Sequence, residues 1–253
     1  MVDTGYLYSK NNKRLFINLS LGCASSCSYC YLDKLGFSNG QYNLDAKTSD
    51  EIKSMINGLN VEVNENTLIS FGCYSECFSD ATKYEVVKLI EHFIHSGNVV
   101  QVSTKKSIDF SMLESALSYV KYYGQFVIFT SCSTISRHDE FEGDTDEVKM
   151  RFKNFKHISE VPVVLYIKPV IEGVTIKDIN EYIEYIKMYG IKDVVVGSIF
   201  DSKGFGEKIP MSSENMYYHP CNDEDIIIDE LSKYARVSKK STKVLELYNS
   251  KML

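Results

Sequence analysis

Short apolar strands alternate with amphipathic helices along most of the chain, and this alternation limits the fold more than any other feature. Six runs rich in β-branched and aromatic residues are predicted to be strands. Near-continuous apolar strands with helical segments between them are typical of a parallel sheet that is covered by helices. The six runs cover residues 14–21, 67–72, 99–104, 125–130, 162–167 and 193–198.

Helix boundaries are also marked between these strands. A hydroxyl residue three positions before a glutamate is the pattern of a capping box, and it occurs three times. Gly190 follows a helical segment at the point where a left-handed residue is expected. These signals predict helices that start at Thr48, Thr82 and Ser111, with further helices at 145–157 and 176–189.

The six strand and helix units fill residues 1–200, which we expect to form one core. About fifty residues remain at 201–253, fewer than two more units need at roughly 25 to 30 residues each. We therefore predict an α/β fold, an open six-stranded parallel partial (β/α)6 barrel (a partial TIM barrel), with a short C-terminal extension packing on or closing it. The acids at 223–230 and the basic residues at 233–243 predict a solvated helix face.

Composition and net charge indicate where the protein acts and which partners it can bind. The N-terminus has no apolar signal segment, and no apolar run approaches the roughly 18 to 20 residues that a membrane span requires. We therefore expect a soluble, cytoplasmic protein that makes no contact with a membrane. The formal net charge of -6 argues against a broad surface for nucleic acid.

Three cysteines lie within eight residues in the loop at 22–31, directly after the first predicted strand. Cys23, Cys27 and Cys30 form a C-x3-C-x2-C pattern, and in a reducing compartment such a cluster indicates metal or redox chemistry. Three thiolates can hold three corners of an iron–sulfur cluster and leave one iron open to a small molecule. The alternatives are a zinc site with a distant fourth ligand, which usually needs a second cysteine pair, or three unrelated buried thiols.

The segment "CASSCSYC", with an aromatic residue before the last cysteine, resembles the cluster motif of the radical S-adenosylmethionine superfamily. The resemblance implies a [4Fe-4S] cluster on Cys23, Cys27 and Cys30 whose open iron binds S-adenosylmethionine. Reductive cleavage would then give a 5'-deoxyadenosyl radical that removes hydrogen from a substrate. It also implies an electron donor such as flavodoxin or ferredoxin, and a Tyr29 ring that packs near the adenine or the cluster.

Smaller matches are similar to the branch that contains spore photoproduct lyase and photolyase-like relatives. "FGCYSECFSD" at 71–80 resembles the segment that follows the second strand in this branch. On this resemblance Cys73 is the hydrogen-donating cysteine, and Ser75 and Glu76 contact the nucleoside of the cofactor. A buried, inert thiol is the alternative for Cys73, and an ordinary loop residue is the alternative for Ser75.

Three further positions are assigned to the cofactor by the same resemblance. Lys105 in "VSTKK" would lie near the carboxylate of S-adenosylmethionine, and Thr130 would face the cofactor with its hydroxyl. Arg151 follows "FEGDT", which resembles a segment of this branch in which proline stands where this chain has Gly143. A solvated turn explains Lys105 equally simply, and loop or cap positions explain Thr130 and Arg151.

Three functions remain open from the sequence. The first is a lyase-like radical enzyme that acts on a nucleic-acid component or another metabolite. The second is a radical S-adenosylmethionine enzyme that modifies peptides or proteins and has a second cluster. The third is a non-catalytic iron–sulfur or zinc-binding module. The second cluster would be held by the remaining cysteines, Cys73, Cys77, Cys132 and Cys221.

Overall fold

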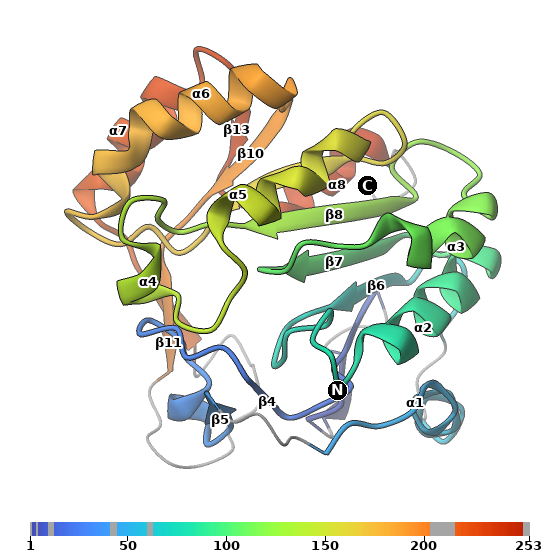
Figure 1. The fold of residues 1–253 in the computed structure, drawn as a ribbon. Coiled ribbons are helices and arrows are strands. Elements are labelled where there is room, and N and C mark those ends of the chain that lie inside the picture. Colours follow the sequence, from blue (N-terminus) through green and yellow to red (C-terminus); the bar gives the residue numbers. More distant parts are fainter. Residues whose placement is uncertain are drawn as a thin grey trace.

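The computed structural model describes residues 2–3, 5–9, 13–40, 45–59, 63–202 and 216–249. Their centre is a nine-stranded sheet with the order β1-β2-β3-β6-β7-β8-β9-β10-β13 (Figure 1). Two small pairs, β4 with β5 and β11 with β12, lie outside this sheet. The strands are β1 (Val2–Asp3), β2 (Leu7–Ser9), β3 (Arg14–Ile17), β4 (Gly22–Cys23), β5 (Ser38–Asn39), β6 (Leu68–Phe71), β7 (Val100–Thr104), β8 (Phe126–Ser131), β9 (Val163–Ile167), β10 (Asp193–Val196), β11 (Ile199–Ser202), β12 (Met216–His219) and β13 (Arg236–Ser238).

The six predicted strands are confirmed as β3, β6, β7, β8, β9 and β10, which are neighbours in this order and parallel. The predicted count of six is nevertheless too low for the whole sheet. β13 adds a parallel strand beside β10, and β2 and β1 extend the other edge in antiparallel fashion. The sheet therefore remains open, with β1 and β13 at its edges.

Helices follow the strands as the alternation predicts. Most of them cover one face of the sheet, where α2, α6 and α7 pack on buried strand residues. The single helix predicted at 145–157 is a short α-helix that continues as a 3-10 helix. The helices are η1 (Asp33–Leu35), α1 (Ser49–Asn57), α2 (Lys83–His95), η2 (Phe110–Leu113), α3 (Glu114–Ser118), α4 (His138–Phe141), α5 (Val148–Arg151), η3 (Phe152–His157), η4 (Thr175–Asp178), α6 (Ile179–Tyr189), α7 (Asn222–Leu231) and α8 (Ser241–Tyr248).

One of the three predicted capping boxes is confirmed. Thr48 and Glu51 exchange hydrogen bonds at the start of α1, as a capping box requires. At the start of α2 the box is wrong, because the Thr82 hydroxyl donates to the Cys77 carbonyl at 2.9 Å instead. The third box is also wrong, since the Asp109 side chain accepts from the backbone N–H of Ser111 and caps η2.

The second face of the sheet carries a separate apolar cluster that α8 covers. Val244 and Leu245 of α8 pack against buried strand residues of this face, among them Val127 and Phe129 of β8. Val148 of α5 belongs to the core cluster on the other face, so α5 and α8 cover opposite faces of the sheet. Because side chains alternate along a strand, each strand contributes to both faces. α8 thus fills part of the second face and leaves the rest of it for a cavity.

The tail is a helix, a strand and a second helix, so the single solvated helix face predicted there is wrong. The acids begin α7, where they favour the positive end of the helix dipole, and Glu224 is buried and accepts from the Cys221 N–H at 3.3 Å. Parts of the predicted extension, 203–215 and 250–253, lie outside the described residues. Within the described part of the chain, no helix is long and apolar enough to cross a membrane.

Candidate active site

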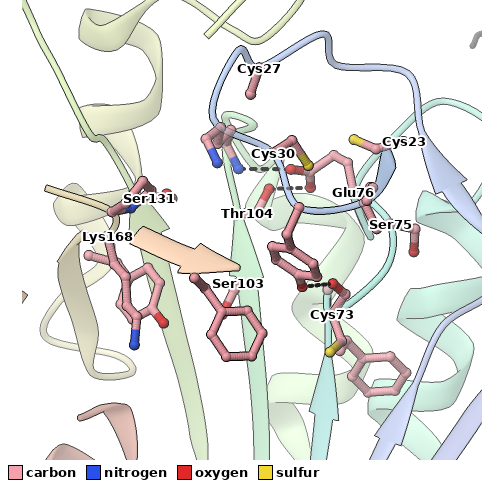
Figure 2. A pocket seen from close by; sticks show the side chains of 18 of the residues that line it. Cys23, Cys27, Cys30, Cys73, Ser75, Glu76, Ser103, Thr104, Ser131 and Lys168 are labelled. Carbon is pink, nitrogen blue, oxygen red and sulfur yellow. Dashed lines mark hydrogen bonds between the residues drawn. The ribbon is translucent and has the colours of Figure 1, made fainter. Parts of the chain in front are cut away.

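A cavity of about 330 Å³ opens on the second face of the sheet, near the carboxyl ends of the parallel strands. The loop after β3 forms one of its walls, and residues of β6, β7 and β9 form others. Figure 2 shows the cysteine loop and Glu76 on one side of this cavity and Ser131 and Lys168 on the other. Carboxyl ends of parallel strands are where α/β folds build their sites.

The three loop cysteines all line this cavity. Cys23, Cys27 and Cys30 are free thiols, and Cys27 is buried. Backbone contacts hold the loop in place: the Ser28 N–H donates to the Phe141 carbonyl at 3.0 Å, and the Gly40 N–H donates to the Cys23 carbonyl at 2.8 Å. One loop therefore presents three thiols to a shared space without a disulfide.

The donor set fits a multi-iron cluster better than a single ion. Among the residues described, no three His, Cys, Asp or Glu side chains are close enough to hold one metal ion. A four-iron cluster has wider ligand spacing, because each thiolate binds a different iron. Burial raises the pKa of Cys27, and it raises the pKa of Cys30 to about 12. Burial therefore favours the protonated thiols, and metal binding would release their protons.

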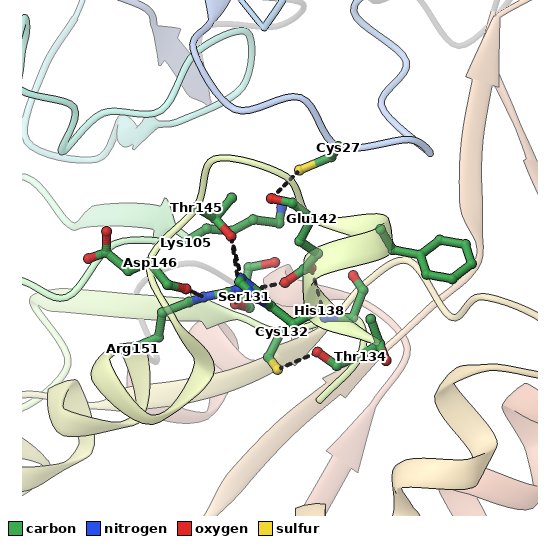
Figure 3. Close-up of polar contacts among 12 residues, drawn as sticks. Cys27, Lys105, Ser131, Cys132, Thr134, His138, Glu142, Thr145, Asp146 and Arg151 are labelled. Atoms are coloured by element: carbon green, nitrogen blue, oxygen red, sulfur yellow. Dashed lines mark hydrogen bonds and ion pairs between the residues drawn. The ribbon is translucent and has the colours of Figure 1, made fainter. Parts of the chain in front are cut away.

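Tyr29 is fixed by a buried ion pair behind the cysteine loop. Its hydroxyl donates to Glu142 Oε1 at 2.5 Å. Glu142 Oε2 pairs with the Arg151 guanidinium at 2.5 Å (Figure 3). Both members of the pair are fully buried. Burial alone would raise the pKa of Glu142, but the charges of Arg151 and Lys105 hold it below its usual value. The pair thus anchors the tyrosine that precedes Cys30.

Gly143 explains why this loop and the Glu142 segment approach each other closely. Its φ is +41°, and a Cβ there would lie 2.1 Å from the Ser26 hydroxyl in the cysteine loop. The Cys27 thiol contacts the Glu142 carbonyl from the same side, with sulfur and oxygen 3.8 Å apart. A side chain at Gly143 would therefore displace the cysteine loop.

Lys105 and Glu76 both line the cavity, as their sequence positions suggested. The Glu76 carboxylate accepts from the Lys105 backbone N–H at 2.8 Å and from the Thr104 hydroxyl at 2.5 Å. The Lys105 ammonium lies 5.5 Å from the centre of the Tyr29 ring. Burial lowers the pKa of Lys105, but the negative charge of Glu142 and the charge that Cys27 carries as a thiolate outweigh burial and raise it. Lys105 is therefore a cation on the cysteine-loop side of the cavity.

Cys73 and Ser75 also line the cavity, beyond the end of β6. Gly72 precedes them with a φ of +86°, and a Cβ there would lie 2.4 Å from the Ser103 carbonyl of β7. Only glycine lets the chain turn so close to the next strand. The Cys73 carbonyl accepts a hydrogen bond from the Tyr31 hydroxyl, which joins this turn to the cysteine loop.

Thr130 and Arg151 do not line the cavity. Thr130 is fully buried in β8, and its hydroxyl accepts from the Asn154 amide at 3.2 Å. Its neighbour Ser131 lines the cavity instead, because side chains alternate along a strand. Arg151 lies behind the wall, where it also donates to the Ser131 carbonyl at 2.9 Å. Both residues therefore lie behind the cavity wall, and Arg151 is linked to the predicted site residue Tyr29 through Glu142.

The four remaining cysteines are not brought together. Cys73 lines the cavity, whereas Cys77 and Cys132 are buried in the core under the helices. The Cys132 thiol contacts the Thr134 carbonyl at 3.4 Å, and Cys221 lies at the start of α7. This arrangement gives no support to a second cluster on these residues.

Several cavity residues were missed in the sequence. Arg14, Gln101, Tyr166 and Lys168 line the cavity from β3, β7 and the end of β9. For Arg14 and Gln101 the signal was a polar side chain inside an otherwise apolar strand, which is a costly position unless the side chain has a partner. The strand periodicity alone did not tell which face held the cavity.

The fold is similar to that of two kinds of solved enzyme structure. A cysteine-to-alanine mutant of spore photoproduct lyase with dinucleoside spore photoproduct aligns with a TM-score of 0.63 and 17% identity, covering 92% of this chain and 79% of the lyase. SuiB of Streptococcus suis bound to S-adenosylmethionine aligns with a TM-score of 0.55 and 12% identity, covering 90% of this chain and 50% of SuiB.

No family model and no curated protein matches the sequence. The solved structures therefore carry the comparison, and at these identities they establish the fold. A further structure of a cysteine-to-alanine mutant of spore photoproduct lyase aligns in the same way, with a TM-score of 0.62 and 16% identity over 92% of this chain and 79% of the lyase. The predicted resemblance is confirmed: this chain has the fold of the radical S-adenosylmethionine enzymes, with spore photoproduct lyase among those it resembles.

Proposed function

We propose that this protein is a radical S-adenosylmethionine enzyme. One observation carries the proposal: three free thiols of a single loop line the same cavity as Lys105, Glu76 and Cys73. In this proposal Cys23, Cys27 and Cys30 hold a [4Fe-4S] cluster. When bound, the cluster supplies the electron that cleaves S-adenosylmethionine to the 5'-deoxyadenosyl radical, which then takes hydrogen from a substrate.

The chain's own residues would bind and orient the cofactor. The Lys105 ammonium pairs with the carboxylate of S-adenosylmethionine, and Ser75 offers a hydroxyl to its nucleoside. The Glu76 carboxylate accepts from the backbone N–H of Lys105 and so positions that lysine. Glu76 also contacts the nucleoside of S-adenosylmethionine. Tyr29 packs beside the cluster, where the Glu142 carboxylate fixes its ring.

The finer features of the fold and setting belong to the same proposal. The parallel strands would curve into a partial barrel around the cavity, with the core at 1–200 and an extension at 201–253. A cytoplasmic reductant such as flavodoxin or ferredoxin would supply the electron. The complex of spore photoproduct lyase with a dinucleoside photoproduct supports a nucleic-acid component as substrate.

Cleavage of S-adenosylmethionine is the test of this function. Anaerobically reconstituted protein, reduced with dithionite, should release 5'-deoxyadenosine, and a non-catalytic module should release none. Lys105→Met should weaken S-adenosylmethionine binding roughly ten- to a hundredfold, because a charge-assisted hydrogen bond is lost. Lys106→Met is the matched control, since the Lys106 ammonium pairs with Asp146 at 3.0 Å. Equal affinities in both variants would remove Lys105 from the cofactor site.

Cys73 is proposed to return a hydrogen atom to the product radical. Its S–H bond would break and a C–H bond would form on the product. The thiyl radical left on Cys73 would then take one electron from the electron donor and a proton from solvent to restore the thiol. Cys73→Ser should keep the iron content and shift the products toward side products, because an O–H bond is too strong to donate its hydrogen atom. Iron analysis and mass spectrometry of the products check this, and a loss of iron would contradict the role.

A further inference from the structure

Gln101 of β7 presents a buried amide to the cavity. The residue is 4% exposed and lines the cavity wall, and its amide oxygen Oε1 has no hydrogen-bond partner. A buried acceptor without a partner costs free energy, and native proteins rarely keep one without a purpose. A ligand in the cavity that carries an N–H group would satisfy it.

Gln101, Ser70, Phe16 and Arg14 form a row of side chains across three neighbouring strands. Ser70 of β6 is its register partner, and Phe16 of β3 is the register partner of Ser70. The Ser70 hydroxyl accepts from Arg14 Nε at 2.8 Å, and the Arg14 guanidinium lies 4.1 Å from the centre of the Phe16 ring. Gln101 thus sits among hydrogen-bonding groups, a cation and an aromatic ring.

This row lies in a different part of the cavity from the cysteine loop. Gln101 precedes Lys105 by four residues, roughly 13 Å along the strand at about 3.3 Å per residue. Beyond the row, the same face of the sheet is filled by Val127, Phe129 and the α8 residues Val244 and Leu245. Because these packed side chains close that side of the row, the space beside Gln101 holds a small group and not a polymer that passes through it.

We infer that Gln101 reads the edge of a nucleobase in the substrate, an inference that rests on the proposed function. A ring N–H or amino N–H donates to Oε1 of Gln101, and its amide NH₂ donates to the adjacent acceptor of the base. Glutamine amides pair with base edges in this two-point manner. The rings of Phe16 and Tyr166 line the same cavity and offer faces on which a base stacks.

The test compares nucleosides that differ only in the N–H group. Isothermal titration of the reconstituted full chain with S-adenosylmethionine present uses thymidine against N3-methylthymidine, and adenosine against N6,N6-dimethyladenosine. In the wild type we expect one unmethylated nucleoside to bind roughly ten- to a hundredfold more tightly than its methylated partner. In Gln101→Leu this preference should disappear.

Thermal melting of the ligand-free variants gives a second, independent readout. Gln101→Leu should raise the melting temperature by a few degrees, because it removes an unsatisfied buried acceptor. Gln125→Leu is the matched control. Gln125 is also buried, but its amide donates to the carbonyls of Ile94 and Asn98, so its loss should lower the melting temperature and leave the nucleoside preference intact.

Three results would overturn the inference. The first is that neither nucleoside pair is discriminated by the wild type. The second is an equal loss of S-adenosylmethionine affinity in Gln101→Leu, which would assign Gln101 to the cofactor's adenine. The third is a simple peptide amide that binds through Gln101 in place of nucleosides. Release of 5'-deoxyadenosine by the same wild-type sample reports on the proposed function separately, so the two failures are distinguishable.

Discussion

Replacing Cys23, Cys27 and Cys30 together with alanine is expected to abolish iron binding. The wild type should hold about four irons after anaerobic reconstitution, because the loop supplies three thiolate ligands for one cluster. The three thiols line one cavity, and of the other four cysteines Cys73 alone lines it, so no substitute set of three ligands is at hand. Iron analysis and the visible absorbance of the cluster measure the effect.

Cys221→Ala is the matched control for this experiment. Cys221 is a half-buried free cysteine at the start of α7, and its removal should leave the iron content near four. Unchanged iron in the triple variant would contradict the proposed cluster site. A wild-type content near eight irons would revive a second cluster, and a drop in Cys221→Ala would identify one of its ligands.

The sheet was predictable from the sequence because its strands are buried on both faces. Runs such as 162–167 are apolar at every position, and they are recognised as strands whether or not the helices between them are predicted correctly. β13 was missed because Arg236 and Ser238 make it a polar edge strand, which has no such pattern. Two capping boxes failed because groups nearby in the sequence competed: the Cys77 carbonyl accepts from the Thr82 hydroxyl, and the Asp109 side chain accepts from the Ser111 N–H.

Part of the site followed from the sequence in the same way. The loop cysteines, Lys105 and Glu76 each lie just past a strand, so strand prediction alone brought them to one edge of the sheet. Whether Thr130 and Arg151 line the cavity depends on the direction of their side chains, which the spacing of residues in the sequence does not reveal. Gln101 was hidden for a related reason: it stands inside a strand, and only the packing of α8 reveals which face of the sheet stays open.

Arg151→Met is expected to lower the free energy of unfolding by about 3 to 5 kcal/mol, because it leaves the Glu142 carboxylate buried and unpaired. Arg151 and Glu142 are both fully buried, and the guanidinium also donates to the carbonyls of Asp146 and Ser131. Arg137→Met is the matched control. Its partner Glu140 is exposed, and a surface pair of this kind contributes about 0.3 to 0.5 kcal/mol.

Chemical denaturation of the iron-free proteins measures both variants. The double variant Arg151→Met with Glu142→Gln should recover part of the lost stability, since it no longer buries a lone charge. The same double variant also distinguishes two roles of the ion pair, which are stabilising the whole fold and holding the cysteine loop in place. The amide that replaces the Glu142 carboxylate keeps an oxygen that accepts from the Tyr29 hydroxyl but lacks the charge that strengthens this hydrogen bond, so a refolded double variant should still bind iron less well than the wild type. Full stability in Arg151→Met alone would contradict the buried pair, and wild-type iron affinity in the double variant would show that the cysteine loop does not depend on it.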